Sequence, residues 1–571
     1  MTGNIDTEAE QTARRTPGAA GPAGRRRLLA IGIWGGCALA GLALWAAYTR
    51  FSQTMPTNSD GAGDALQAWA MLHGNWLLKG WTLTDVSFYT TELPQYLLVD
   101  LATGLNGNVI HVAAGMTYAL ALLGAAALAA GRGRGWAAVI GVCIAAGIML
   151  DPQGADGVDI LLSSPDHIGT SVPIMAAWLI LDRTRPGWQA VIAVSLVLGW
   201  AEVADSLVTY AAIAPLALVV LIRLADPLLR DRSVPWRRTL AARRYEIALA
   251  VGAIAAAVVA HLALRLITAL GGFSSPGPTS SVAPLGHILD HNLPVLGHGL
   301  LLLFGADFLD YRVGLVVVLH LVSVLLVVAG SGLAARRFLA DHDLVAQLLL
   351  AGIVVNLAVF IVSTNVAGLP TMREVDVVLP FSAALAGRQL GPRIAKALTA
   401  GSRSPGTRPA GLPRTVAAGL LVALGIVGAG YAVGLARAVR TPVAVSSEQQ
   451  LAGWLEARHL NDGLAGYWQA DAVTLFSEDK VRVRLVDVDY RLRPQVLVQG
   501  ARESYAGWYD PTANTANFVV LAPYTSQFPG FTDLAAVTAT FGQPTRTYHY
   551  DGYTILVWPH ANLLTELAPA N

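Results

Sequence analysis

Residues 28–49 read LLAIGIWGGCALAGLALWAAYT, an apolar run without a single charged side chain. A helix that crosses about 30 Å of hydrocarbon needs ~20 apolar residues, so this run is long enough to span a membrane. It follows Arg25-Arg26-Arg27 and lacks the small-residue cleavage site that ends a secretory signal peptide. We therefore expect a retained first transmembrane helix, preceded by a disordered cytoplasmic tail at residues 1–27.

The composition of the whole chain supports a membrane protein. Hydrophobic residues make up 54% of the 571 residues and charged residues 13%, and the mean hydropathy is +0.51. A soluble protein carries roughly 25% charged residues, so this chain has too few charges to cover a surface that faces water. No basic stripe is interleaved with aromatic residues, and we expect no nucleic-acid partner.

Further apolar segments along the chain are close to the length of a membrane span. They cover residues 109–130, 136–150, 168–182, 188–204, 206–225, 245–268, 313–330, 344–363, 376–390 and 414–436. Together with the first segment they predict an all-α polytopic membrane protein with about eleven transmembrane helices. Two more segments, 92–105 and 285–305, are ambiguous and could lie in the interface or re-enter the membrane.

The distribution of arginine and lysine predicts the orientation. Loops on one side carry basic pairs such as Arg132 and Arg134, whereas the opposite loops carry few basic residues. Basic residues concentrate on the cytoplasmic side, so the N-terminus is expected in the cytoplasm of a plasma-membrane protein. The predicted transmembrane domain covers residues 28–436. Its outer loops are 50–108, 151–167, 271–312 and 364–376.

The remaining residues, 437–571, differ in character, because charged residues become more frequent and the aromatic residues spread out. An odd number of crossings places this tail outside the cytoplasm. Residues 446–459 have helical spacing with a capping Ser446, and 481–485, 517–521 and 553–558 have the character of strands. We expect a small extracytoplasmic α/β domain.

Acidic and histidine residues gather in the predicted outer loops, together with an arginine. The candidate site residues are Asp60, Asp64, Glu92, Asp166, His167, Arg373 and Glu374. A carboxylate among them could remove a proton from an acceptor hydroxyl as a general base, and Arg373 could bind a phosphate through its planar fork. Asp60, Asp64 and Asp166 could also hold a hard divalent cation such as Mg or Mn through their oxygens.

These carboxylates also have purely structural alternatives. Asp60 and Asp64 lie among glycine and serine, a composition that is common in turns. Asp64 could cap a helix that begins near Ala65, and Asp166 with His167 could cap the segment that follows them.

The segment Asn58-Ser59-Asp60-Gly61, placed early in a long outer loop after the first helix, resembles the GT-C superfamily of membrane glycosyltransferases. The many short helices and the outer C-terminal tail are similar to that family as well. An uncharacterised actinomycete group shares stretches like 58–69, 87–96, 164–167 and Arg373-Glu374. Members of the superfamily take a sugar from a polyprenyl-phosphate donor and pass it to an acceptor outside the membrane.

The resemblance implies hexosyl or pentosyl transfer to a glycan, lipid or protein of the cell envelope. It makes Asp60 the candidate catalytic carboxylate and Arg373 the ligand of the donor phosphate, with Asp166 as the second catalytic candidate. Asp64, Glu92, His167 and Glu374 would support them. Two alternatives stay open: a transporter or flippase of a lipid-linked precursor, which would place polar groups at the bilayer midplane, and a non-catalytic scaffold or sensor.

Overall fold

The computed structural model describes residues 22–57, 59–152, 160–231, 235–276, 280–309, 314–399, 414–490, 494–498, 502–523 and 531–567. The chain divides into two compact units, Met1–Leu44 and Trp45–Asn571. Helix α1 (Pro22–Ser52) begins before the expected Leu28, so the tail prediction is wrong for Arg25 to Arg27, which are helical. Arginine and alanine are good helix formers, which lets the helix extend into its polar flank. Residues 1–21 of the predicted tail lie outside the described residues.

Each expected apolar segment coincides with a helix. Besides α1 these are α4 (Asn108–Ala130), α5 (Trp136–Met149), α7 (Ile168–Arg183), α8 (Trp188–Ala204), η1 with α9 (Thr209–Ile213, Ala214–Arg230), α11 (Arg244–Ala269), α14 (Leu315–Arg336), α15 (Leu344–Val362), α16 (Val378–Thr399) and α17 (Arg414–Ala438). A short α10 (Trp236–Ala242) precedes α11.

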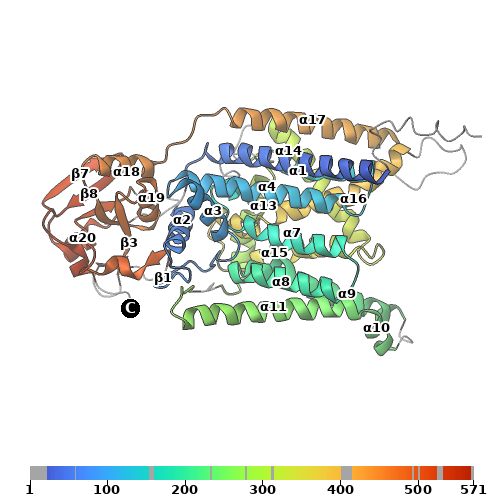
Figure 1. Ribbon diagram of the computed structural model, residues 1–571, viewed down its shortest axis with the longest axis horizontal. Helices are drawn as coiled ribbons and strands as arrows, with labels where there is room; N and C mark the ends of the chain where they lie inside the picture. The colour runs from blue at the N-terminus through green and yellow to red at the C-terminus, as the bar shows by residue number, and fades with distance from the viewer. Residues whose placement is uncertain are drawn as a thin grey trace, which may run out of the picture. The chain divides into compact units, whose positions relative to one another are not determined.

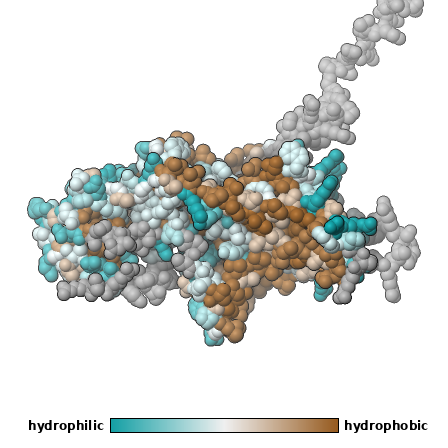
Figure 2. All heavy atoms as spheres, turned by 90° about the horizontal axis from the view of Figure 1, so that it is seen from below, coloured by the Kyte–Doolittle hydropathy of each residue, from teal (hydrophilic) through white to brown (hydrophobic). Residues whose placement is uncertain are grey.

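Six helices among the described residues are long and apolar enough to cross a membrane. They are Asn108–Ala130, Thr209–Arg230, Arg244–Ala269, Leu315–Arg336, Leu344–Val362 and Thr415–Ala438. Large apolar side chains such as Leu196, Val259 and Leu325 are mostly exposed, and Figure 2 shows hydrophobic atoms gathered over the helical part of the molecule. The chain thus has the helices and surface of a multi-pass membrane protein, whereas the count of eleven crossings stays a prediction.

Several helices are too short to cross. The two ambiguous segments form α3 (Leu93–Thr103) and the series α12 (Leu285–His287), η2 (Ile288–Asn292) and α13 (Leu293–Leu303). With 11 residues, α3 measures about 16 Å, roughly half the hydrocarbon thickness. Two further short helices carry predicted site residues: α2 (Ser59–Leu72) and the 3-10 helix η3 (Leu369–Val375).

The C-terminal residues form a six-stranded sheet in the order β4-β3-β2-β6-β8-β7. Its strands are β2 (Asp462–Ala465), β3 (Arg482–Asp489), β4 (Gln495–Val498), β6 (Phe518–Leu521), β7 (Arg546–Tyr550) and β8 (Tyr553–Val557). The predicted strands correspond to β3, β6 and β8. The predicted helix is α18 (Ser447–Glu456), and Ser446 accepts a hydrogen bond from the Gln449 amide as its cap.

Strand β2 is parallel to both of its neighbours, β3 and β6. Helix α19 (Tyr467–Phe476) follows β2, and helix α20 (Leu534–Phe541) follows β6. The side chains of β6 are all buried and alternate between two hydrophobic clusters, one shared with α19 and one with α20. Because the chain leaves neighbouring strands toward opposite faces, a crevice is expected at the carboxyl edge between β2 and β6.

The sheet region and the helices share a hydrophobic core. Ala472 and Leu475 of α19 belong to the same buried cluster as Leu66 of α2 and Ile110 of α4. A second link is the antiparallel pairing of β1 (Trp81–Thr82) with β5 (Ser504–Tyr505). Figure 1 shows α19 and the sheet next to α2, beyond the ends of the long helices. Independent folding of residues 437–571 stays a prediction, and this shared core places apolar surface of α19 against the helices.

Candidate functional site

A cavity of about 890 Å³ lies where α2, α7 and η3 meet the sheet region. Six of the seven predicted site residues line it: Asp60, Asp64, Asp166, His167, Arg373 and Glu374. On the sheet side it is lined by residues that follow β2, including Tyr467, and by the second half of β3, including Asp487. The cavity thus lies at the carboxyl edge of the parallel strands β2 and β3.

Asp60 is held by the first turn of α2, where a negative charge is favourable at the positive end of the helix. The hydroxyl of Ser59 donates to the Tyr467 carbonyl at 2.7 Å, which fixes α2 against α19. Glycine allows the close packing: a Cβ at Gly61 would lie 2.8 Å from Cγ2 of Ile110. Helix α2 begins at Ser59 and includes Asp64, so Asp64 does not cap a helix that starts at Ala65.

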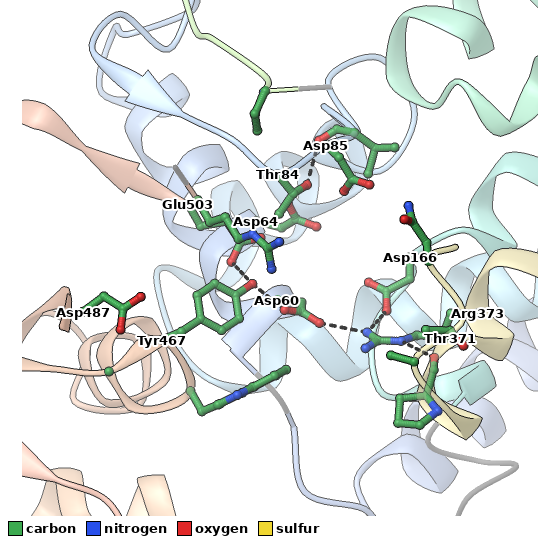
Figure 3. A pocket seen from close by; sticks show the side chains of 18 of the residues that line it. Asp60, Asp64, Thr84, Asp85, Asp166, Thr371, Arg373, Tyr467, Asp487 and Glu503 are labelled. Carbon is green, nitrogen blue, oxygen red and sulfur yellow. Dashed lines mark hydrogen bonds and ion pairs between the residues drawn. The ribbon is translucent and has the colours of Figure 1, made fainter. Parts of the chain in front are cut away.

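Arg373 joins two of the predicted carboxylates. Its Nη1 donates to Oδ2 of Asp60 at 2.8 Å and to Oδ2 of Asp166 at 2.9 Å (Figure 3). Nε donates to the Pro370 carbonyl at 3.3 Å, and Nη2 makes no hydrogen bond to any residue that the structure describes. Three residues far apart in sequence therefore meet at one point, while one guanidinium nitrogen stays available to the cavity.

Asp166 and His167 precede α7 in a strained turn. Asp166 has φ +29°, a region that non-glycine residues rarely adopt and that often marks functional sites. His167 occupies the N-cap position without a capping bond, and its Nδ1 lies 2.8 Å from Oδ2 of Asp205. Burial by itself lowers the pKa of His167, but the Asp205 carboxylate raises it to about 10. His167 is therefore a cation at neutral pH.

Burial raises the pKa of several other acidic groups. It raises the pKa of Asp64 well above its usual range, and the carboxylates of Asp166, Glu92 and Asp60 raise it further. Burial likewise raises the pKa of Glu92 to about 8 and that of Glu374 above its ordinary value. Glu92 does not line the cavity and lies behind it, where its carboxyl fills the space that a Cβ at Gly169 would need.

Two residues of the C-terminal region complete the site. The Tyr467 hydroxyl contacts Oδ1 of Asp60 and lies 2.8 Å from Oε2 of Glu503. Glu503 is 2% exposed and has φ +43°. Neither residue is among the site residues predicted from the sequence, and the pairing of His167 with Asp205 was not predicted either. A glycine and an aromatic residue after a parallel strand are a weak signal, and the four residues of β2 are too few to predict that strand.

The arrangement does not fit a divalent cation between the predicted ligands. No group of three or more His, Cys, Asp or Glu side chains is placed to hold a metal ion within the described parts of the chain. Where Asp60 and Asp166 meet, the Arg373 guanidinium already occupies the position between their oxygens. A cation there would be repelled by the guanidinium unless Arg373 moved.

No family model matches the sequence, and no curated protein matches it either. Among solved structures, the chain is similar to ArnT from Cupriavidus metallidurans bound to undecaprenyl phosphate, with a TM-score of 0.52 and 12% identity over 95% of this chain and 100% of that chain. ArnT in the apo state gives a TM-score of 0.50 at 12% identity, with the same coverage of 95% and 100%. The oligosaccharyltransferase of Archaeoglobus fulgidus gives 0.47 at 13% identity, over 84% of this chain and 68% of that chain.

The chain therefore has the fold of ArnT. The likeness extends over nearly the whole chain and includes the C-terminal region. At 12% identity this likeness shows the fold alone, and the reaction must be inferred from the residues of the site.

Proposed function

We propose that this protein is a membrane glycosyltransferase that moves a sugar from a polyprenyl-phosphate donor to an acceptor of the cell envelope. The observation that carries the proposal is the Arg373 guanidinium, which lies between Asp60 and Asp166 in the wall of a large cavity. A cation for a leaving phosphate and a carboxylate for an acceptor hydroxyl are the groups that such a transfer needs. ArnT, which has the same fold, has been solved with undecaprenyl phosphate.

The placement of charge supports an extracytoplasmic site. The cavity residues Asp166 and His167 lie just before the start of α7, whereas Arg183, Arg230 and Arg336 lie in the last turns of α7, α9 and α14. By the positive-inside rule the arginine-rich end faces the cytoplasm. With eleven crossings the N-terminus is then cytoplasmic and the C-terminal sheet lies outside. A phosphatase fused after Arg440 should be active and one fused at Arg238 silent; the reverse pattern would place the cavity inside.

The first step is binding of the donor phosphate by Arg373. Nη2, which has no partner among the described residues, can donate to a phosphate oxygen before either ion pair breaks. As the guanidinium turns toward the phosphate, Oδ2 of Asp60 loses its partner and becomes free to accept a hydrogen bond from the acceptor hydroxyl. Donor binding therefore uncovers the base.

The second step is the transfer itself. Oδ2 of Asp60 takes the hydroxyl proton as the acceptor oxygen forms its bond to the anomeric carbon. The bond between that carbon and the phosphate oxygen breaks, and its electron pair stays on the phosphate, where Arg373 stabilises the added charge. The products are the glycosylated acceptor and polyprenyl phosphate. Asp166 holds Arg373 when Asp60 is released, and the His167 cation limits the negative charge around them.

A divalent cation such as Mg or Mn remains a prediction. The described residues offer no ligand set for it, and neither step of the proposed transfer requires one. The flippase alternative predicted polar groups at the bilayer midplane, whereas the cavity lies at helix ends. In proteoliposomes a flippase would move undecaprenyl-phosphate sugars between leaflets without forming a new glycoside.

Binding of undecaprenyl phosphate to the purified protein in nanodiscs tests the donor site. Arg373→Lys keeps the charge but loses the planar fork, so the affinity should fall about tenfold. Arg265→Lys, on the exposed face of α11 and outside the cavity, is the matched control and should bind as the wild type does. Equal binding by wild type and Arg373→Lys would contradict the proposal.

A further inference from the structure

A single hydroxyl lies between two carboxyl groups at the cavity wall. Tyr467 Oη contacts Oδ1 of Asp60 on one side and is 2.8 Å from Oε2 of Glu503 on the other. The hydroxyl has one proton, so it can donate to one of the two groups. If both carboxyls were ionised, the second contact would join two oxygens with no proton between them. One of the two carboxyls must therefore carry a proton.

The surroundings decide which carboxyl is protonated. Asp60 receives Nη1 of Arg373 on its other oxygen, and that cation stabilises its negative charge. The carboxyl and hydroxyl groups that act on Glu503 are those of Asp60 and Asp64 of α2, Tyr467 and Asp471 of α19, and Tyr96 of α3. The preceding residue, Arg502, lines the same cavity. Burial and the nearby carboxylates raise the pKa of Glu503 well above its usual range. The ion pair of Asp60 with Arg373 and the burial of Glu503 together favour the proton on Glu503.

We propose that Glu503 is a neutral hydrogen-bond donor in a chain from Glu503 through Tyr467 to Asp60, which holds Asp60 ionised and in a fixed orientation. The Glu503 hydroxyl donates to Tyr467 Oη, and Tyr467 donates to Oδ1 of Asp60, which leaves Oδ2 for the acceptor. No proton leaves this chain during the reaction. Tyr467 and Glu503 are positioning residues, and their effect on catalysis rests on the function proposed above.

The chain of bonds matters most when Arg373 turns toward the donor phosphate. Asp60 then loses its cation, and the bond from Tyr467 remains to stabilise its charge. Hydrogen bonds to an ionised group are roughly twice as strong as neutral ones, and a second donor behind the first polarises it further. The base thus stays ionised and oriented at the moment when it is needed.

The fold holds Glu503 in place at a cost. Its φ of +43° is a strained backbone conformation for a glutamate. The following residues, Ser504 and Tyr505, form β5 and are fixed by pairing with β1. A Cβ at Gly63 would lie 2.5 Å from Oε2 of Glu503, so glycine in α2 leaves the space that its carboxyl fills. Segments distant in the sequence therefore cooperate to place one side chain against Asp60.

Infrared spectroscopy of the purified protein tests the protonation without any substrate. The carbonyl-stretch band of a protonated carboxyl should be present in the wild type at neutral pH and reduced in Glu503→Gln. Glu478→Gln, whose side chain is 56% exposed, serves as the control and should leave the band unchanged. A spectrum of Glu503→Gln that matches the wild type in this region would overturn the proposal, because Glu503 would then be ionised.

Kinetics test the positioning role, with undecaprenyl-phosphate hexoses and pentoses as donors. Glu503→Gln should keep kcat within about threefold, because its amide can still donate to Tyr467. Glu503→Leu and Tyr467→Phe should each lower kcat about 10- to 100-fold with an unchanged KM for the donor, since each weakens a bond to a charged group. The double variant Tyr467→Phe/Glu503→Leu should have the same kcat as Tyr467→Phe alone, because both substitutions break the same chain of hydrogen bonds.

The outcomes separate this inference from the proposed function. If Asp60→Asn is inactive and Glu503→Gln is as slow as Glu503→Leu, the neutral-donor role is wrong while the transferase remains. If Asp60→Asn keeps full activity, the proposed mechanism fails, and the infrared band still decides the protonation of Glu503. Unchanged kcat in Tyr467→Phe would remove the positioning role.

Discussion

Two arginines hold pairs of carboxylates at the two ends of α7, about 24 Å apart for a helix of 16 residues. At the end away from the cavity, Arg388 donates from Nε to Asp343 at 2.7 Å, from Nη2 to Asp182 at 2.7 Å and from Nη1 to the Leu128 carbonyl at 3.0 Å. At the cavity, Arg373 places both carboxylates on Nη1. A cation whose nitrogens are all engaged fastens helices together, whereas one with a free nitrogen in a cavity can bind a ligand.

The surroundings of the two clusters differ as well. Near Arg388 a second arginine, Arg223, is also fully engaged, with Gln347, Glu246 and the His342 carbonyl. Near Arg373 the carboxyls outnumber the cations, and burial raises the pKa of Asp64 and of Glu503 well above their usual ranges. Unbalanced buried acids lower stability, and proteins retain them where function needs perturbed protonation. We therefore expect the Arg388 cluster to be structural and the Arg373 cluster to be functional.

The largest expected effect on sugar transfer comes from replacing Asp60, the proposed general base. Asp60→Asn should lower sugar transfer by about 10²- to 10⁴-fold, because general-base assistance is lost, and should leave unfolding almost unchanged. Asp226→Asn removes a carboxylate from an ion pair beside the exposed Arg230 and serves as the control. Transfer is measured in membranes with a radiolabelled polyprenyl-phosphate sugar. Activity of Asp60→Asn equal to that of the control would show that the clusters do not differ as described.

For stability, the larger loss should come from the Arg388 cluster and the smaller one from the Arg373 cluster. Arg388→Met leaves Asp182, whose side chain is 2% exposed, without its partner and should cost about 3–5 kcal/mol. Arg373→Met leaves Asp60, 22% exposed, and Asp166, 6% exposed, without their partner, but both carboxylates line the cavity, so the loss should be smaller, about 1–3 kcal/mol. Unfolding in mixed micelles by titration with a denaturing detergent compares the two variants. Equal losses would mean that Arg373 is as structural as Arg388.

The free energy of unfolding, measured over a range of pH, tests whether Glu92, which lies behind the cavity, is protonated in the folded protein. Burial raises its pKa from 4.5 to about 8, so the folded protein binds this proton more tightly than the unfolded chain. The stabilisation is complete below the unfolded pKa and is lost as the pH rises through the folded pKa. Relative to Glu92→Gln, the wild type should lose up to about 1.4 kcal/mol per pH unit between pH 4.5 and 8. Parallel stability curves would mean that Glu92 is ionised in the folded protein.

The smallest effect is expected from a single methyl group. Gly63→Ala places a Cβ 2.5 Å from Oε2 of Glu503 and should lower kcat about tenfold by displacing that side chain. Gly428→Ala on α17 meets no atom within 4 Å and should raise stability by at most about 1 kcal/mol with unchanged kcat. If both variants keep the wild-type kcat, the close contact between α2 and Glu503 has no role in the reaction.

The sequence predicted the helices well, because the free energy of placing a side chain in lipid is local and sums along a segment. Each expected apolar segment coincides with a helix, and Ser446 caps α18 as its hydroxyl and position predict. The prediction erred at the start of α1, where the helix continues into Arg25 to Arg27. Polar residues there do not end a helix that has good helix formers on both sides.

The sequence also supplied the residue types of the site, since unpaired acids and an arginine in loops beside apolar helices require an explanation. It could not say that Arg373 touches Asp60 and Asp166, or that Tyr467 and Glu503 complete the group, because these contacts join residues hundreds of positions apart. Such contacts depend on how helices pack, on the pairing of β1 with β5, and on the docking of α19 against α2. Lipid solvation, which acts residue by residue, determined the helices from sequence, whereas packing between distant segments determined which charges share one cavity.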